Sequence, residues 1–125
     1  MANVDEWVGK AEEDWSVAVS LTRRRKLPVP SIVCFHCQQC VEKYLKACLV
    51  YHRDKPPRIH DLHKLLVLCE RRDPLLGALA SQMKALDPHA VLTRYPGATA
   101  TVNEAKDAVA AARVARQVLR KRLGL

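Results

Sequence analysis

Residues 31–51 read SIVCFHCQQCVEKYLKACLVY, and the spacing of apolar residues in this segment indicates an amphipathic helix. Apolar residues that recur at steps of three and four fall on one face of a helix, and that face packs into a core. The predicted buried face consists of Cys34, Cys37, Val41, Tyr44, Leu45 and Cys48. Ser31 is the predicted N-cap, because a serine hydroxyl accepts a hydrogen bond from a free backbone N–H group.

The same segment has a second face made of polar side chains. They recur at steps of three, four and seven, so they share one side of the helix. They are Gln39, Glu42, Lys43 and Lys46. A helix inside a bundle has neighbours on several sides, so a charged stripe on it must face solvent, a groove or a partner subunit.

Helix start signals lie on both sides of this segment. Asn3 and Glu6 form a capping-box pattern ahead of the first predicted helix. Thr101 and Glu104 form the same pattern ahead of the last one. The predicted helices cover about residues 3–25, 31–51, 61–72, 74–85 and 101–123.

Two Asp–Pro pairs, Asp73–Pro74 and Asp87–Pro88, each combine an aspartate cap with a proline at the first helical position. Only four glycines occur, and no alternating apolar pattern is bounded by turn signals, so strands are not expected. Short connections between amphipathic helices favour antiparallel neighbours. The sequence therefore predicts an all-α protein, an antiparallel up-and-down bundle of about four to five helices, as a single domain over residues 1–125.

The composition is that of a globular protein with an excess of basic residues. The chain has 125 residues and a formal net charge of +8, from 21 Lys and Arg against 13 Asp and Glu. The longest uncharged stretch, residues 27–41, is too short for a membrane span. The chain start lacks the apolar run of a signal peptide, so we expect a cytoplasmic protein without a membrane partner.

The basic excess indicates an acidic partner, such as nucleic acid, a nucleotide or an acidic protein. The small number of aromatic side chains favours contacts with phosphate groups over base stacking. The alternative is that the basic groups only solubilise helix ends, where cations are favourable.

Five cysteines raise the question of a disulfide or metal site. Their odd number, without an export signal, argues against a disulfide framework. Cys34, Cys37 and Cys40 have the spacing of some iron–sulfur ligand runs. On a helix each step of three turns the side chain by about 60°, so the outer sulfurs diverge. We expect buried thiols, no metal site and no cofactor.

The segment between the second and third predicted helices gathers imidazole and guanidinium groups. His60 and His63 can transfer protons near neutral pH. Arg53 and Arg58 can hold phosphate oxygens. If the protein is a nuclease, these four residues are the candidate catalytic groups for metal-independent RNA cleavage. The structural alternative is that Asp61 caps the third helix and the neighbouring residues only pack or face solvent.

A loop containing Arg94, Tyr95 and Pro96 precedes the last predicted helix. Loops on a rigid scaffold often carry functional side chains. The alternative is a proline-closed turn with Tyr95 packed on the bundle.

Three motifs, in this order, resemble those of the HEPN domain, a family of small all-helical proteins. They are FHCQQCVEKYLK at residues 35–46, His60-Asp61-Leu62, and Arg94-Tyr95-Pro96. The resemblance extends from the Asp14–Trp15 region through the last helix. It implies a helical bundle that is often dimeric and, in stand-alone members, frequently encoded beside a minimal nucleotidyltransferase. Other members look like metal-independent ribonucleases with an arginine a few residues ahead of a histidine.

The ribonuclease motif is incomplete at its expected place ahead of the last helix. At the required distance after Arg94 stand Thr99, Ala100 and Thr101 rather than a histidine. The pairs Arg53–His60 and Arg58–His63 have the right spacing but lie between other helices. The chain thus resembles the branch of the family without nuclease activity, whose polar groove binds a nucleotide or a partner.

The leading hypothesis is a protein that binds an ATP-like nucleotide, a partner minimal nucleotidyltransferase, or both, as half of a two-gene toxin–antitoxin-like module. The alternatives are a ribonuclease toxin that acts on RNA through an Arg/His pair, and an assembly module with no ligand of its own. We expect a homodimer with no enzymatic activity in the chain alone. The predicted binding residues are Gln39, Glu42, Lys43, Lys46, His60, Asp61, Arg94 and Tyr95.

Each predicted binding residue type suits a particular role. Lys43, Lys46 and Arg94 are expected to bind phosphates. Asp61 is expected to orient His60, and Tyr95 to pack against a base or a sugar.

Overall fold

The computed structural model describes residues 1–90, 96–97 and 99–125. Five α-helices follow one another as α1 (Val4–Thr22), α2 (Pro30–Tyr51), α3 (Leu62–Glu70), α4 (Ala80–Leu86) and α5 (Val102–Arg122). Two short 3₁₀ helices, η1 (Pro74–Leu79) and η2 (Asp87–His89), flank α4. No strand occurs among the described residues. The prediction of an all-α bundle is confirmed.

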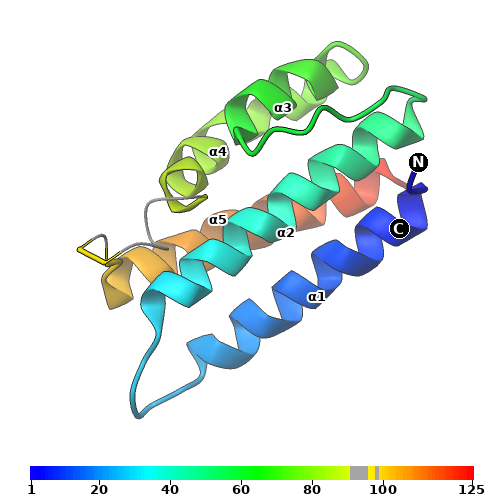
Figure 1. The fold of residues 1–125 in the computed structure, drawn as a ribbon. Coiled ribbons are helices and arrows are strands. Elements are labelled where there is room, and N and C mark those ends of the chain that lie inside the picture. The colour runs from blue at the N-terminus through cyan, green and yellow to red at the C-terminus, as the bar shows by residue number, and fades with distance from the viewer. Residues whose placement is uncertain (91–95, 98) are drawn as a thin grey trace.

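Helix α2 forms the centre of the bundle. It packs against α1, α3 and α5, and also contacts α4 and η2. Figure 1 shows α1 on one side of α2, the α3 and α4 pair on the other side, and α5 behind. The connection at residues 52–61 runs back along α2 toward the start of α3 (Figure 1). This path returns residues of the connection to the polar side chains of α2.

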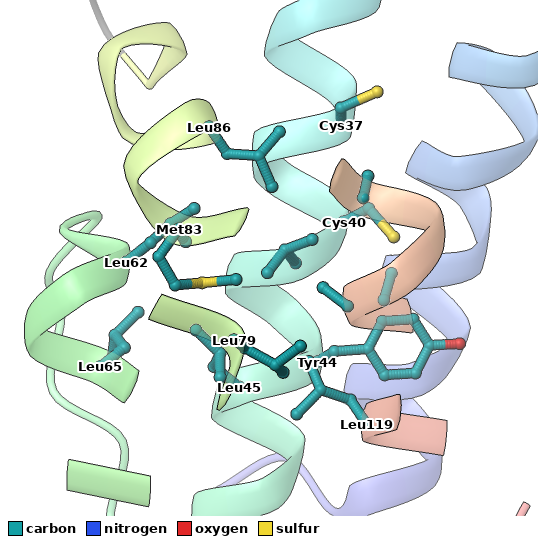
Figure 2. Packing of buried hydrophobic residues seen from close by; sticks show 14 of the residues in the cluster. Cys37, Cys40, Tyr44, Leu45, Leu62, Leu65, Leu79, Met83, Leu86 and Leu119 are labelled. Carbon is teal, nitrogen blue, oxygen red and sulfur yellow. The ribbon is translucent and has the colours of Figure 1, made fainter. Parts of the chain in front are cut away.

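The core is built around α2, of which 13 of 22 residues are buried. The six residues of its predicted apolar face are all buried. Figure 2 shows Met83 and Leu86 of α4 pointing toward α2, with Leu86 at the level of Cys37. Burying such side chains contributes about 1.5–3 kcal/mol each, which makes the apolar contact the main source of stability.

Local capping signals are confirmed at three helix starts. The capping boxes of Asn3 with Glu6 and of Thr101 with Glu104 are both complete. Asp61 caps α3, where its carboxylate accepts a hydrogen bond of 3.0 Å from the Lys64 N–H group. These caps satisfy backbone donors that lack partners inside the helix.

The prediction of Ser31 as the N-cap of α2 is wrong. The helix begins at Pro30 with Val29 in the N-cap position and no side-chain cap. Proline at the first position has no N–H group to satisfy and a preset φ angle, so the helix starts without a hydroxyl cap. The Ser31 hydroxyl instead accepts a hydrogen bond of 2.9 Å from the Ala100 N–H group, which joins α2 to the segment before α5.

The two Asp–Pro pairs do not cap the helices that they precede. The Asp73 carboxylate accepts a hydrogen bond of 2.6 Å from Arg122 Nε. The Asp87 carboxylate accepts one of 2.8 Å from the Leu62 N–H group, at the start of α3. The expected single helix at 74–85 is divided into η1 and α4. Each aspartate thus binds a partner that is distant in sequence, which a local cap signal does not predict.

Within the described part of the chain, no helix combines the length and the apolar content that crossing a membrane requires.

Candidate functional site

The polar face of α2 is largely buried, although a solvent-exposed stripe was one of the expectations. The side chain of Glu42 is 4% exposed and that of Lys46 is 7% exposed. Lys46 Nζ donates a hydrogen bond of 3.1 Å to Glu42 Oε2. A buried pair of this kind is costly to break, because removing one partner leaves an uncompensated charge inside the protein.

His60 lies against the same carboxylate. Its Nδ1 is 2.9 Å from Glu42 Oε1, and its side chain is 65% exposed. A carboxylate only accepts hydrogen bonds, so Nδ1 carries the hydrogen and Nε2 is left for solvent or a ligand. A histidine held in this way has the orientation that general bases have in enzymes.

The side-chain amide of Gln38 contacts both His60 and Glu42. It is fully buried, and its Nε2 donates a hydrogen bond of 3.0 Å to the His60 carbonyl oxygen. The same Nε2 lies 3.5 Å from Glu42 Oε1, and Gln39 Nε2 donates to Gln38 Oε1 at 2.7 Å. We refer to Glu42, Lys46, His60, Gln38 and Gln39 as the Glu42 cluster.

A basic pocket opens beside the Glu42 cluster. Its volume is about 380 Å³, and its lining residues are Met1, Trp7, Lys46, Lys55, Pro56, Pro57 and Arg58. Lys46 belongs to both the pocket and the cluster, and its Nζ lies 5.6 Å from the centroid of the Trp7 ring. Three cationic side chains, one aromatic ring and two prolines thus line one concave surface. Pockets of this size hold small organic ligands.

A second carboxylate cluster joins α1 to α2. Asp14 of α1 is 2.7 Å from His36 Nδ1 and 2.5 Å from Lys43 Nζ. All three side chains are buried or half-buried. We refer to these three residues as the Asp14 cluster. Lys43, one of the predicted phosphate-binding residues, is therefore paired with an internal carboxylate.

The structure brings some predicted site residues together and separates others. Glu42, Lys46, His60 and Gln39 form one network, whereas Asp61 caps α3, and Glu42 takes the place beside His60 that was expected of Asp61. Among the candidate nuclease residues, Arg58 lines the basic pocket, and His60 is connected to the pocket through Glu42 and Lys46. Arg53 and His63 are exposed side chains outside that lining. Arg94 and Tyr95 lie outside the described residues.

Sequence reasoning missed three important residues. Gln38 is four residues after Cys34 and three before Val41, so it falls on the predicted apolar face of α2. A polar residue in that position was a detectable signal of a buried network. Neither Trp7 nor Asp14 was predicted as a site residue. Their contacts depend on how α1 rests on α2, which is not encoded in local spacing.

The thiols lie outside this site. All five cysteines are buried and free. Burial raises the pKa of Cys34 to about 11 and that of Cys37 to about 12. At neutral pH these two thiols are therefore protonated. Among the residues that the structure describes, no group of three or more His, Cys, Asp or Glu side chains could hold a metal ion.

Comparison with known proteins identifies the family of this chain. A profile of the HEPN domain matches residues 4–122. The chain belongs to the HEPN family. The glutamate–lysine pair and His60 that form the Glu42 cluster come from two of the three motifs that carry the resemblance.

Two solved structures share the HEPN fold of this chain. ST0689, described as an archaeal HEPN homologue, is 23% identical with a TM-score of 0.77, covering 98% of this chain and 99% of that one. TT1696 from Thermus thermophilus is 23% identical with a TM-score of 0.82, covering 97% of this chain and 98% of that one. No curated protein matches the chain. At this identity the two structures establish the fold alone.

Proposed function

We propose that this HEPN protein binds a nucleotide in the basic pocket. The observation that carries the proposal is that Lys46, Lys55 and Arg58 line one concavity together with Trp7. Arginine offers a planar fork to phosphate oxygens, and lysine offers a mobile point charge. The Trp7 ring and the prolines at 56–57 supply an apolar wall for a base or a sugar. This site keeps Lys46 from the predicted set, and Lys55 and Arg58 take the place of Lys43.

Calorimetric titration of ATP into the full chain tests the proposal. An affinity tag belongs at the C-terminus, because Met1 lines the pocket. We expect saturable binding that weakens about tenfold in Arg58→Ala and Lys55→Ala, which corresponds to about 1.4 kcal/mol for each lost phosphate contact.

Arg25→Ala is the matched control for charge. Arg25 is exposed and lies in the connection between α1 and α2, outside the pocket. Equal weakening in Arg25→Ala would indicate only nonspecific attraction of an anion to a basic protein. Absence of saturable binding at millimolar ATP would contradict the proposal.

A ribonuclease is the second candidate function, and the contact between Glu42 and His60 favours it. His60 Nε2 would remove the proton from an RNA 2′-hydroxyl. The 2′-oxygen would then form a bond to phosphorus while the bond to the 5′-oxygen breaks, and the leaving oxygen would take a proton from water. Lys46 and Arg58 would stabilise the charge that develops on the phosphate.

Incubation of the purified protein with a fluorescent RNA oligonucleotide tests this candidate. Cleavage that is lost in His60→Asn and retained in His52→Asn supports it, because His52 is the C-cap residue of α2 and does not line the pocket. Intact RNA after incubation with the unmodified chain would exclude ribonuclease activity of the chain alone.

The proposal extends to partners. In line with the family resemblance, the protein would act as a homodimer with a minimal nucleotidyltransferase in a toxin–antitoxin-like pair. Sedimentation analysis tests the dimer, and co-purification with the product of the adjacent gene tests the pair. Co-purification that persists in Arg58→Ala, together with absence of nucleotide binding, would favour an assembly module with no ligand of its own.

A further inference from the structure

The basic pocket is connected to His60, and the regulation that this connection allows rests on the proposed nucleotide binding. Glu42 is shared between two groups, because one carboxylate oxygen contacts Lys46 and the other contacts His60. Lys46 is shared in turn, because its ammonium group contacts Glu42 and its side chain lines the pocket. The pocket and His60 are thus connected through a single buried carboxylate.

His60 can gain a proton without breaking its contact with Glu42. Nδ1 already carries the hydrogen that faces the carboxylate, so the second proton goes to Nε2. The side chain is 65% exposed, which leaves room for that proton to reach solvent. Imidazole is the side-chain group that ordinarily changes its charge between about pH 5 and 8, and nearby charges alter that change.

Several elements carry charged or titratable groups in the region of His60. Helix α2 contributes Glu42 and Lys46, the connection contributes Lys55, Arg58 and Asp61, and α3 contributes His63. The Asp61 carboxylate is held by the Lys64 N–H group, and the Asp87 carboxylate of η2 by the Leu62 N–H group. The contact of the His60 ring itself is with Glu42.

From this connection we propose that anion binding in the basic pocket is coupled to protonation of His60. When a phosphate accepts hydrogen bonds from Lys46, the negative charge of Glu42 loses part of its compensation. The bound anion also adds negative charge next to His60. Both effects favour the protonated imidazole. Binding therefore takes up a proton, and affinity rises as the pH falls from about 8 to about 6.

The coupling is reciprocal. If the ligand favours the proton by a given factor, the proton favours the ligand by the same factor. Coupling of this kind commonly amounts to about fivefold or more. We therefore expect the affinity for ATP to increase at least about fivefold between about pH 8 and about pH 6, with less than one proton taken up per site at intermediate pH.

The first test measures proton uptake directly. ATP is titrated into the full chain by calorimetry in buffers that differ in ionisation enthalpy, so that the buffer-dependent heat gives the number of protons bound. ATP itself also exchanges protons when it binds. The His60→Asn variant lacks the imidazole, so its proton uptake measures the contribution of ATP without that of His60. We expect a greater uptake in the unmodified chain than in His60→Asn. Equal uptake in the two proteins would overturn the coupling while leaving nucleotide binding intact.

The second test requires no ligand and separates the two proposals. The protonated fraction of His60 is followed by NMR of its ring in the free protein. We expect it to increase in Lys46→Gln, where Glu42 loses its ammonium partner, and to decrease in Glu42→Gln. Thermal unfolding and the amide spectrum verify that each variant is folded.

The two tests together distinguish failure of the coupling from failure of nucleotide binding. Shifts of the protonated fraction of His60 in opposite directions in the two variants support a carboxylate shared by His60 and Lys46. If ATP does not bind in that case, the proposed nucleotide binding is wrong, but the charge connection between Lys46 and His60 remains supported. Unchanged His60 titration in both folded variants would overturn the coupling, whatever the result with ATP.

Discussion

The Glu42 cluster and the Asp14 cluster each place one carboxylate against a histidine and a lysine, and the Glu42 cluster also contains Gln38 and Gln39. Glu42 contacts Lys46 and His60, and Asp14 contacts Lys43 and His36. They differ in exposure, because the His60 side chain is 65% exposed and that of His36 is 25% exposed. They also differ in surroundings, since the Glu42 cluster adjoins the basic pocket through Lys46.

The comparison indicates that a carboxylate, a histidine and a lysine can have two different roles along α2. In the Asp14 cluster the carboxylate comes from α1, so its ion pairs fasten α1 to α2. In the Glu42 cluster the carboxylate and the lysine both belong to α2, and the histidine comes from the connection. We infer that the first cluster supports the fold and the second supports the pocket. The predictions that follow test this division.

The largest effect is expected from Glu42→Ala. The substitution leaves the Lys46 ammonium group buried without a carboxylate, so we expect a loss of about 3–5 kcal/mol in the free energy of unfolding. Urea denaturation followed by circular dichroism measures it. Glu42→Gln keeps a hydrogen-bond acceptor and is expected to lose less. A loss in Glu42→Ala below about 1 kcal/mol would show that the cluster is hydrated rather than buried.

A smaller effect is expected from Asp14→Ala. His36 and Lys43 are both about one-quarter exposed, so water can solvate them once the carboxylate is gone. We expect a loss of about 1–3 kcal/mol in the free energy of unfolding, with ATP affinity unchanged. Urea denaturation and calorimetric titration measure the two quantities. Weakened ATP binding in a fully folded Asp14→Ala protein would contradict the division between the clusters.

Glu12 provides a carboxylate without a histidine for reference. The hydrogen bond from Arg116 holds the pKa of Glu12 below its usual range. The stabilisation is therefore complete above the usual pKa of a glutamate and is lost as the pH falls through the lowered value.

We expect Glu12→Gln to lose about 1 kcal/mol of stability at neutral pH and to match the unmodified chain in acid. Thermal unfolding over a pH series measures the two curves. Parallel curves that never converge would show that the carboxylate charge is not the source of the stabilisation.

The smallest effect is expected at Arg53, which opens the connection that carries His60. Its φ angle is +65°, a left-handed conformation that costs a side-chain-bearing residue about 1–2 kcal/mol. Glycine adopts it freely but loses more entropy on folding, so we expect Arg53→Gly to gain about 0.5 kcal/mol. Urea denaturation measures the gain. Reduced RNA cleavage in this stabilised variant would indicate that the Arg53 side chain has a functional role. An unchanged protonated fraction of His60 would show that the backbone strain at Arg53 does not affect the Glu42 cluster.

Much of the fold was predictable because its signals are local. The apolar steps of residues 31–51 predicted the buried face of α2, and the capping boxes at Asn3 and Thr101 predicted two helix starts. Ser31, Asp73 and Asp87 were assigned caps that they do not form. Their side chains bind groups distant in the sequence, and local preference does not contain that information.

The candidate site was predictable in part. Glu42, Lys46 and His60 were recognised as polar residues, and the structure joins them in one network. The burial of Glu42 and Lys46 was not expected, because an i,i+4 pair on a helix is usually an exposed pair. Gln38 could have been found, since it interrupts the apolar face of α2 with a polar side chain. That Lys55 and Trp7 line the same pocket could not have been predicted from their spacing in the sequence.

Local sequence signals alone predict the starts of α1, α3 and α5 and the apolar face of α2, because periodicity and capping act between residues a few positions apart. The contacts of His60 with Glu42 and of Lys43 with Asp14, and the place of Met1 in the pocket lining beside Lys55, arise only from the tertiary structure. These contacts depend on how α1 and the 52–61 connection lie against α2. That arrangement is set by the packing of the whole core, so the two clusters acquire their different roles only when the bundle is assembled.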